Sequence, residues 1–196
     1  PPMEELVGRE SGSRFSVYKL FGYLFTLGFL VFFALVAMAG VGNAFLFRLF
    51  AAWFLVNGLL SFGLAKLAGA HWSSAGVGGA VAWLTSVNPL LAPGWFAGYV
   101  ELRYIDVNVT DIAELNELLD DTETPVRRLL GQMLEVPLFR LMVIVAMTNV
   151  GSFVGSVLFA TVLIPYLFAE VGGTGEVVRL MVEGARNSVD LLAGGL

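Results

Sequence analysis

Proline interrupts the longest uncharged run of this chain. Leu67–Val100 contains 34 residues without a charge, which is long enough to enter a bilayer. The run includes Asn-Pro at 88–89 and Ala-Pro-Gly at 92–94, where proline removes a backbone donor and opposes a helix. Broken backbone is tolerated at membrane depth only where protein or a water-filled cavity covers it. We therefore predict two half-helices within 72–101, forming a re-entrant segment or a kinked spanning helix; short helices joined by a loop at the membrane surface are the alternative.

The composition and the other uncharged runs place the chain among membrane proteins. Of its 196 residues, 57% are hydrophobic and 14% are charged, whereas soluble domains carry about 25% charged residues. Apolar stretches predict membrane helices at 18–40, 44–67 and 138–168. We expect an all-α integral membrane protein with about three spanning helices plus the broken segment at 72–101. The lipid bilayer is then its first partner, and a multi-pass position in the cell membrane is its expected location.

Polar and amphipathic stretches divide the rest of the chain. Residues 1–18 are predicted to be a juxtamembrane linker ahead of a transmembrane domain at 19–169. Residues 103–137 are predicted to form an extramembrane amphipathic helical hairpin within that domain. Its acidic face is interpreted as solvated, because the spacing of a calcium loop is absent; a cation site is the alternative. Residues 170–196 are expected to include an amphipathic helix that lies on the membrane or packs against another subunit.

Several kinds of chemistry are disfavoured by residue counts. The chain has no cysteine, a single histidine and a net charge of −5, which argues against disulfides, a multi-histidine metal site and nucleic-acid binding. We expect no catalytic residue, no metal and no cofactor, because no nucleophile–base pair is visible. His71 lies beside Trp72 and is interpreted as an interface residue, with catalysis as the alternative.

Polar residues within the apolar runs are the candidates for a binding site. Each amide is expected to face protein, because an unsatisfied amide in hydrocarbon costs several kcal/mol. A structural hydrogen bond between helices is the alternative to a ligand contact. The candidate polar core consists of Asn57, His71, Ser86, Asn88, Pro89, Gly94, Trp95, Glu101 and Asn149.

Small residues at helical spacing predict close helix packing. Such residues let two backbones approach, either within one chain or between subunits of a homo-oligomer, and both alternatives stay open. The predicted packing positions are Gly94, Gly98, Gly151, Ser152 and Gly155.

Basic residues predict the orientation. If 72–101 returns to its own side, eight bases share one side: Arg9, Arg14, Lys19, Lys66, Arg103, Arg127, Arg128 and Arg140. Three then share the other side: Arg48, Arg179 and Arg186. If 72–101 instead crosses the bilayer, the two sides carry six and five basic residues. The positive-inside rule favours the larger asymmetry, so we predict a re-entrant segment with a cytoplasmic N-terminus and a cytoplasmic hairpin.

Motifs in chain order resemble the TraB/PrgY family, the pheromone-shutdown proteins. They are Pro1-Pro2, Trp53-x-x-Val56-Asn57-Gly58, His71, the run from Ser86 to Trp95, and Asn149-x-Gly151-Ser152-x-x-Gly155. The stretch Tyr99–Leu119 looks like the archaeal branch. The resemblance implies that this chain is the C-terminal membrane domain of a TraB-like protein. It also implies a covalently linked soluble domain, similar to the Tiki and erythromycin-esterase-like group, with a Gly-x-x-His motif that has no match here.

The resemblance therefore implies a membrane-anchoring or binding domain that holds a hydrolase-like domain at the membrane, with peptide as a candidate ligand. Any peptidase activity is expected in the domain that these residues lack. The opening Pro1-Pro2-Met3 fits a piece of a longer protein. Two alternatives come from the membrane pattern alone. One is a small transporter or channel-like module that uses the broken segment, and the other is a structural subunit of a larger membrane complex.

Overall fold

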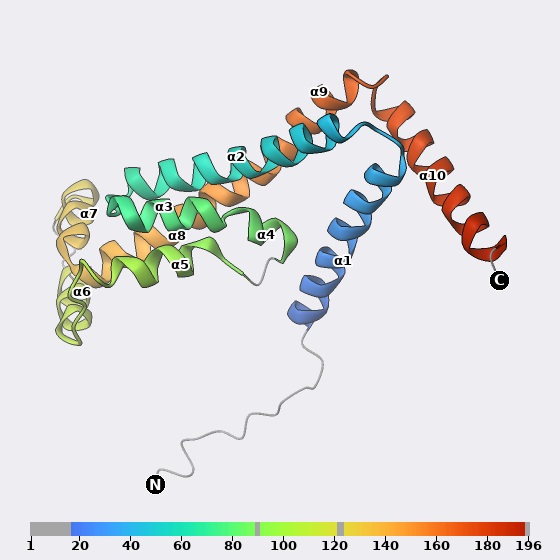
Figure 1. The fold of residues 1–196 in the computed structure, drawn as a ribbon. Helices are drawn as coiled ribbons and strands as arrows, with labels where there is room; N and C mark the ends of the chain where they lie inside the picture. Colours follow the sequence, from blue (N-terminus) through green and yellow to red (C-terminus); the bar gives the residue numbers. More distant parts are fainter. Residues whose placement is uncertain (1–16, 89–90, 121–123, 195–196) are drawn as a thin grey trace, which may run out of the picture.

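The computed structural model describes residues 17–88, 91–120 and 124–194, and every regular element in those ranges is a helix. The prediction of an all-α fold is confirmed for this part of the chain (Figure 1). Pro89 and residues 1–16 of the predicted linker lie outside the described ranges. The helices in chain order are α1 (Val17–Met38), α2 (Asn43–Leu67), α3 (Trp72–Val81), α4 (Trp83–Val87), α5 (Pro93–Glu101), α6 (Thr110–Asp120), α7 (Val126–Glu135), α8 (Pro137–Leu158), the π-helical turn η2 (Phe159–Leu163), α9 (Ile164–Ala169) and α10 (Thr174–Gly194).

Two long apolar helices lie side by side through the middle of the molecule (Figure 1). One is α2, and the other is the continuous helix Pro137–Ala169 that α8, η2 and α9 form together. Both are long and apolar enough to cross a membrane by length and composition, whereas the apolar part of α1, Gly22–Met38, is shorter. Only 28% of the most apolar stretch of each long helix is buried, and each helix also carries exposed large apolar side chains.

The last long helix continues through a proline. Proline usually ends or kinks a helix, yet this one runs past Pro165 to Ala169. The turn just before Pro165 is π-helical, and Ile164 N–H donates to Phe159 O across five residues. A π turn rearranges the backbone bonds locally. Pro165 then occupies the first turn of α9, where its missing N–H leaves no gap.

The broken apolar segment folds back on itself as a hairpin. Asn88 ends α4 with extended backbone, φ −141° and ψ 105°, as expected for a residue before proline. Pro93 begins α5, which returns beside α3, and both arms pack against the long helices (Figure 1). The ends of the segment meet where His71 N–H donates to Glu101 Oε2 at 2.9 Å. The kinked-helix alternative is therefore wrong.

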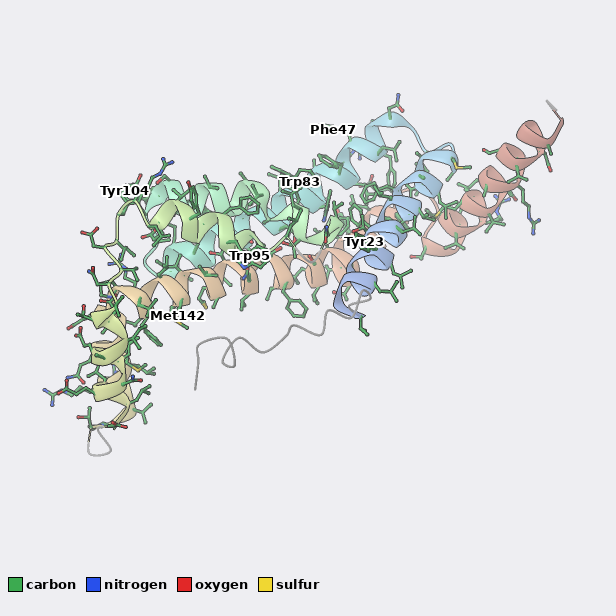
Figure 2. All side chains as sticks on the ribbon, turned by 90° about the horizontal axis from the view of Figure 1, so that it is seen from below. Tyr23, Phe47, Trp83, Trp95, Tyr104 and Met142 are labelled. Atoms are coloured by element: carbon green, nitrogen blue, oxygen red, sulfur yellow. The ribbon has the colours of Figure 1, made fainter. Side chains whose placement is uncertain are left out.

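A second hairpin, α6 and α7, runs across the end of the long-helix pair in both views (Figures 1 and 2). Asp111 fixes it there, because its buried carboxylate accepts hydrogen bonds from Asn108 N at 3.3 Å and from Leu138 N at 3.1 Å. Leu138 lies in the first turn of α8, where backbone N–H groups lack helical partners. The sequence Thr110-Asp111-x-x-Glu114 resembles a capping box, and Asp111 within it provides the acceptor oxygen.

The other end of the molecule joins α1, α2, α9 and α10 around an apolar cluster (Figure 1). Val36, Leu49, Phe168 and Val177 are its buried centre, one from each of these helices. α10 also packs against α1, and its exposed face carries ion pairs. There the Arg179 guanidinium donates to the Glu176 carboxylate and holds the pKa of that carboxyl below its ordinary value.

Candidate functional site

The predicted polar core divides into two groups in space. One is a seam between the long helices and the α3–α5 hairpin, with Asn57, Gly94 and Asn149. The other is a cluster at the end of the bundle, with His71 and Glu101. The structure brings Trp95 into neither group, because its side chain is 61% exposed on α5. Asn88 is half-buried at the end of α4.

Two further members of the prediction cannot be placed. The Ser86 side chain, on α4, lies outside the described part of the chain, and Pro89 does too.

Asn57 joins the two long helices. It is fully buried in α2, its Nδ2 donates to Trp53 O of its own helix at 3.0 Å, and its Oδ1 accepts from Ser156 Oγ at 2.9 Å. The second bond crosses from α8 to α2. Both the nitrogen and the oxygen of the amide are therefore hydrogen-bonded to protein groups. Side-chain amides that bond across helices in this way stabilise helix packing.

The small residues of α8 make close contact with α2 inside this chain. A Cβ on Gly151 would lie 2.5 Å from Ser61 Cα, and a Cβ on Gly155 would lie 2.8 Å from Asn57 Cα. Ser152 turns toward the hairpin, where its Oγ donates to Ala82 O at 3.0 Å. Of the two open alternatives for Gly151 and Gly155, the structure therefore shows internal packing.

Asn149 holds the returning arm of the hairpin against α8. Its Oδ1 accepts from Gly94 N at 2.7 Å, in the first turn of α5 where a backbone donor has no helical partner. A Cβ on Gly94 would overlap Val145 O, and a Cβ on Gly98 would lie 2.6 Å from Val145 Cγ2. Glycine at both positions therefore lets α5 approach α8 closely enough for the Asn149 bond.

Replacing Asn149 by leucine should leave the Gly94 N–H without its acceptor. A buried donor that loses its partner costs about 1–3 kcal/mol. We expect the thermal unfolding midpoint of the detergent-solubilised chain to fall by several degrees, because each kcal/mol shifts the midpoint by about 2–4 °C in a chain of this size. The matched control is Asn116→Leu, which removes an exposed amide on α6. Equal midpoints for both variants would show that the Asn149 bond contributes nothing.

The end cluster is organised by Glu101, which is 1% exposed. Its carboxylate accepts the His71 N–H at the start of α3, where the helix dipole favours a negative charge. The His71 ring stacks on Tyr104 with centroids 3.8 Å apart, and its Nδ1 accepts from Ser73 N at 3.4 Å. Figure 2 shows Tyr104 at the end of the bundle that carries the α6–α7 hairpin. His71 thus serves as the N-cap of α3.

Two cations close the connection between α2 and α3. Lys66 Nζ donates to Ala70 O, and Arg140 donates to Gly69 O at 2.7 Å. Positive groups near the last carbonyls of a helix complement its dipole. The two cations lie at the C-terminal end of α2, and the Glu101 carboxylate lies at the N-terminal end of α3. The charges of this cluster therefore stabilise helix ends, which is a structural role. Among the described residues, no three His, Asp or Glu side chains converge in the way that a metal site requires.

Some contributors escaped the sequence reasoning. Arg140 was counted only for its charge, and Tyr104 was not singled out. Asp111 had a usable signal, because Asn108-x-x-Asp111 has the spacing of a helix N-terminus with a side-chain acceptor. For Ser156 no signal in the sequence indicates its Asn57 partner.

Comparison with known proteins identifies a family. A family model described as TraB family protein, C-terminal domain, matches residues 17–168. That range runs from the start of α1 almost to the end of α9 and excludes α10. No curated protein and no solved structure matches the chain.

Proposed function

Because this chain belongs to the TraB family and contains that family's C-terminal domain, we propose that it is the membrane-anchoring domain of a TraB-like protein. The main support for this proposal is the set of apolar side chains that the two long helices expose. Leu55 and Leu59 on α2 and Phe153 on α8 are between 51% and 69% exposed. Large apolar side chains exposed along both helices are unfavourable in water, and in the proposed arrangement a bilayer covers them.

In the proposed arrangement α2 and Pro137–Ala169 cross the bilayer. The 25 residues of α2 extend about 37 Å at 1.5 Å per residue, enough for a hydrocarbon core of about 30 Å. α1 is proposed as a third span, and the α3–α5 hairpin as a re-entrant segment that returns to the side of α6 and α7. That side is proposed to be cytoplasmic, because it carries more of the described bases. These are Lys19, Lys66, Arg103, Arg127, Arg128 and Arg140, against Arg48, Arg179 and Arg186 on the other side.

The family description as a C-terminal domain supports a further part of the proposal. The domain would hold the preceding, hydrolase-like domain of the same protein at the membrane surface, and any peptidase chemistry would belong to that domain. Peptide is the candidate ligand of the whole protein. A transporter or channel-like role is less well supported, because it needs polar groups available at membrane depth. Asn57 and Asn149 instead use their side chains in contacts within protein.

Labelling of single cysteines tests the arrangement without interference, because the chain has no cysteine of its own. Leu67→Cys and Arg103→Cys flank the hairpin, and Asn43→Cys and Thr174→Cys lie at the opposite end of the long helices. In sealed vesicles, an impermeant maleimide should reach positions 67 and 103 from one side and positions 43 and 174 from the other.

Opposite sides for 67 and 103 would exclude the re-entrant hairpin. Labelling of all four positions from the outside, without permeabilising the vesicles, would exclude membrane spanning altogether.

A further inference from the structure

Two basic side chains meet at the connection between α2 and α3, residues 68–71. Lys66 comes from the last turn of α2, and Arg140 comes from the start of α8. Lys66 Nζ donates to Ala70 O, and Arg140 Nη2 donates to Gly69 O at 2.7 Å. The two acceptors are successive carbonyl oxygens of one short loop, so the two positive charges are held close to each other.

Neither cation has an acidic partner in the described part of the chain. The ion pairs found there are Arg48–Glu170, Arg179–Glu176 and Arg179–Glu183. Glu101, the acid of the end cluster, is 1% exposed and accepts the His71 N–H. Two cations and one carboxylate leave the cluster with one net positive charge, and like charges held together repel each other. An anion beside the two cations therefore lowers the electrostatic energy.

Both side chains keep N–H donors for such an anion. An ammonium and a guanidinium each have several donors, and the bonds to the loop use one from each. Arg140 is exposed, and Lys66 is half-buried. A guanidinium presents its donors as a fork that matches phosphate oxygens, and a lysine ammonium adds a point charge. The pair is therefore suited to a phosphate group.

The position of Lys66 along α2 indicates the source of the phosphate; this step rests on the proposed membrane anchoring. Lys66 follows Arg48, the other charged residue of α2, by 18 residues, about 27 Å along the helix. That length is close to the thickness of a hydrocarbon core, about 30 Å. The Lys66 ammonium lies 4.5 Å from the centre of the Trp72 ring, and this tryptophan is 66% exposed. Because tryptophan is enriched at membrane–water interfaces, the two cations lie at the level of lipid headgroups.

We propose that Lys66 and Arg140 form a binding site for the phosphate of an anionic membrane lipid. A zwitterionic lipid such as phosphatidylcholine also has a phosphate, but the two cations repel its choline group, so the site prefers a headgroup with net negative charge. This end of the domain is proposed to face the cytoplasm, and the cytoplasmic leaflet carries anionic lipids. The bound phosphate thereby links the end of α2 to the start of α8.

Lipid selectivity in detergent tests the site. The 196-residue chain is mixed with equal amounts of dioleoyl phosphatidylglycerol and dioleoyl phosphatidylcholine and analysed by native mass spectrometry. We expect wild type to bind one phosphatidylglycerol in preference. Arg140→Gln and Lys66→Gln, as two independent variants, should each weaken that binding by about tenfold, the value of one hydrogen bond to a charged group. Arg140→Lys keeps the positive charge and should retain most of the binding.

The matched control is Arg127→Gln, which removes the same charge from an exposed position on α7 and should bind lipid as wild type does. Equal binding by Arg140→Gln and Arg127→Gln would overturn the proposal, as would equal binding of the two lipids by wild type. Displacement of the lipid by millimolar inorganic phosphate would contradict the lipid source and assign the site to a soluble phosphate.

Vesicle association separates this site from the anchoring proposal. Arg140→Gln should associate with vesicles as wild type does, because the apolar surface of the long helices is unchanged. Failure of the wild-type chain to associate would contradict the anchoring proposal, whereas intact association without any lipid preference would contradict this site alone.

Discussion

Replacing Gly151 by valine is expected to destabilise the chain by at least about 3 kcal/mol, the upper part of the range for overpacked sites. The reason is the nature of the neighbours. A Cβ at this position would lie 2.5 Å from Ser61 Cα and 2.6 Å from Leu60 O, both of which are backbone atoms of α2. Backbone cannot rotate out of the way as a side chain can, so the two long helices must separate along their contact.

Gly63→Val is the matched control for this prediction. Gly63 lies within α2, and a Cβ there would meet no atom within 4 Å. Both variants introduce the same β-branched residue into a helix, so the cost in helix propensity is common to both. Thermal unfolding followed by circular dichroism in detergent should show a midpoint lowered by about 6–12 °C for Gly151→Val, at about 2–4 °C per kcal/mol. Equal midpoints for the two variants would show that α2 and α8 are not packed backbone to backbone.

The positions of the long helices followed from the sequence. Apolar stretches predicted helices at 44–67 and 138–168, and the structure has them at Asn43–Leu67 and Pro137–Ala169. Local chemistry decides such boundaries, because glycine, proline and charged residues mark the ends of apolar runs. The break between the two arms of the hairpin could also be predicted from local sequence, because Pro93 and the residue before Pro89 have few allowed backbone conformations.

The pairings that build the candidate site could not be predicted in this way. Asn149 bonds a backbone N–H 55 residues away, and Glu101 bonds one 30 residues away. The polar residues could be recognised because they interrupt apolar runs. Their partners are backbone N–H groups at helix ends, which every helix has whatever its sequence. Which end lies within reach depends on how the helices pack. The small residues of α8 illustrate the same limit, because their spacing suits a contact within the chain as well as one between chains.

A charge at Phe153 is expected to have the second large effect. Phe153 lies at the midpoint of Pro137–Ala169 and its side chain is 69% exposed. If water covered this surface, Phe153→Arg would change stability by no more than about 0.5 kcal/mol, as exposed substitutions usually do. An arginine at the centre of a helix in a bilayer costs about 2.5–3.5 kcal/mol. The size of the effect therefore reports directly on what covers the long helices.

Val126→Arg provides the matched control, because Val126 is 71% exposed on α7, which the proposed arrangement places outside the bilayer. The decisive measurement is the fraction of each variant that stays in the membrane pellet after alkaline carbonate extraction. The account predicts that wild type and Val126→Arg remain in the pellet, while Phe153→Arg is largely extracted or degraded. Equal retention of Phe153→Arg and Val126→Arg, or complete extraction of the wild-type chain, would contradict the claim that this domain is held in the membrane by its long helices.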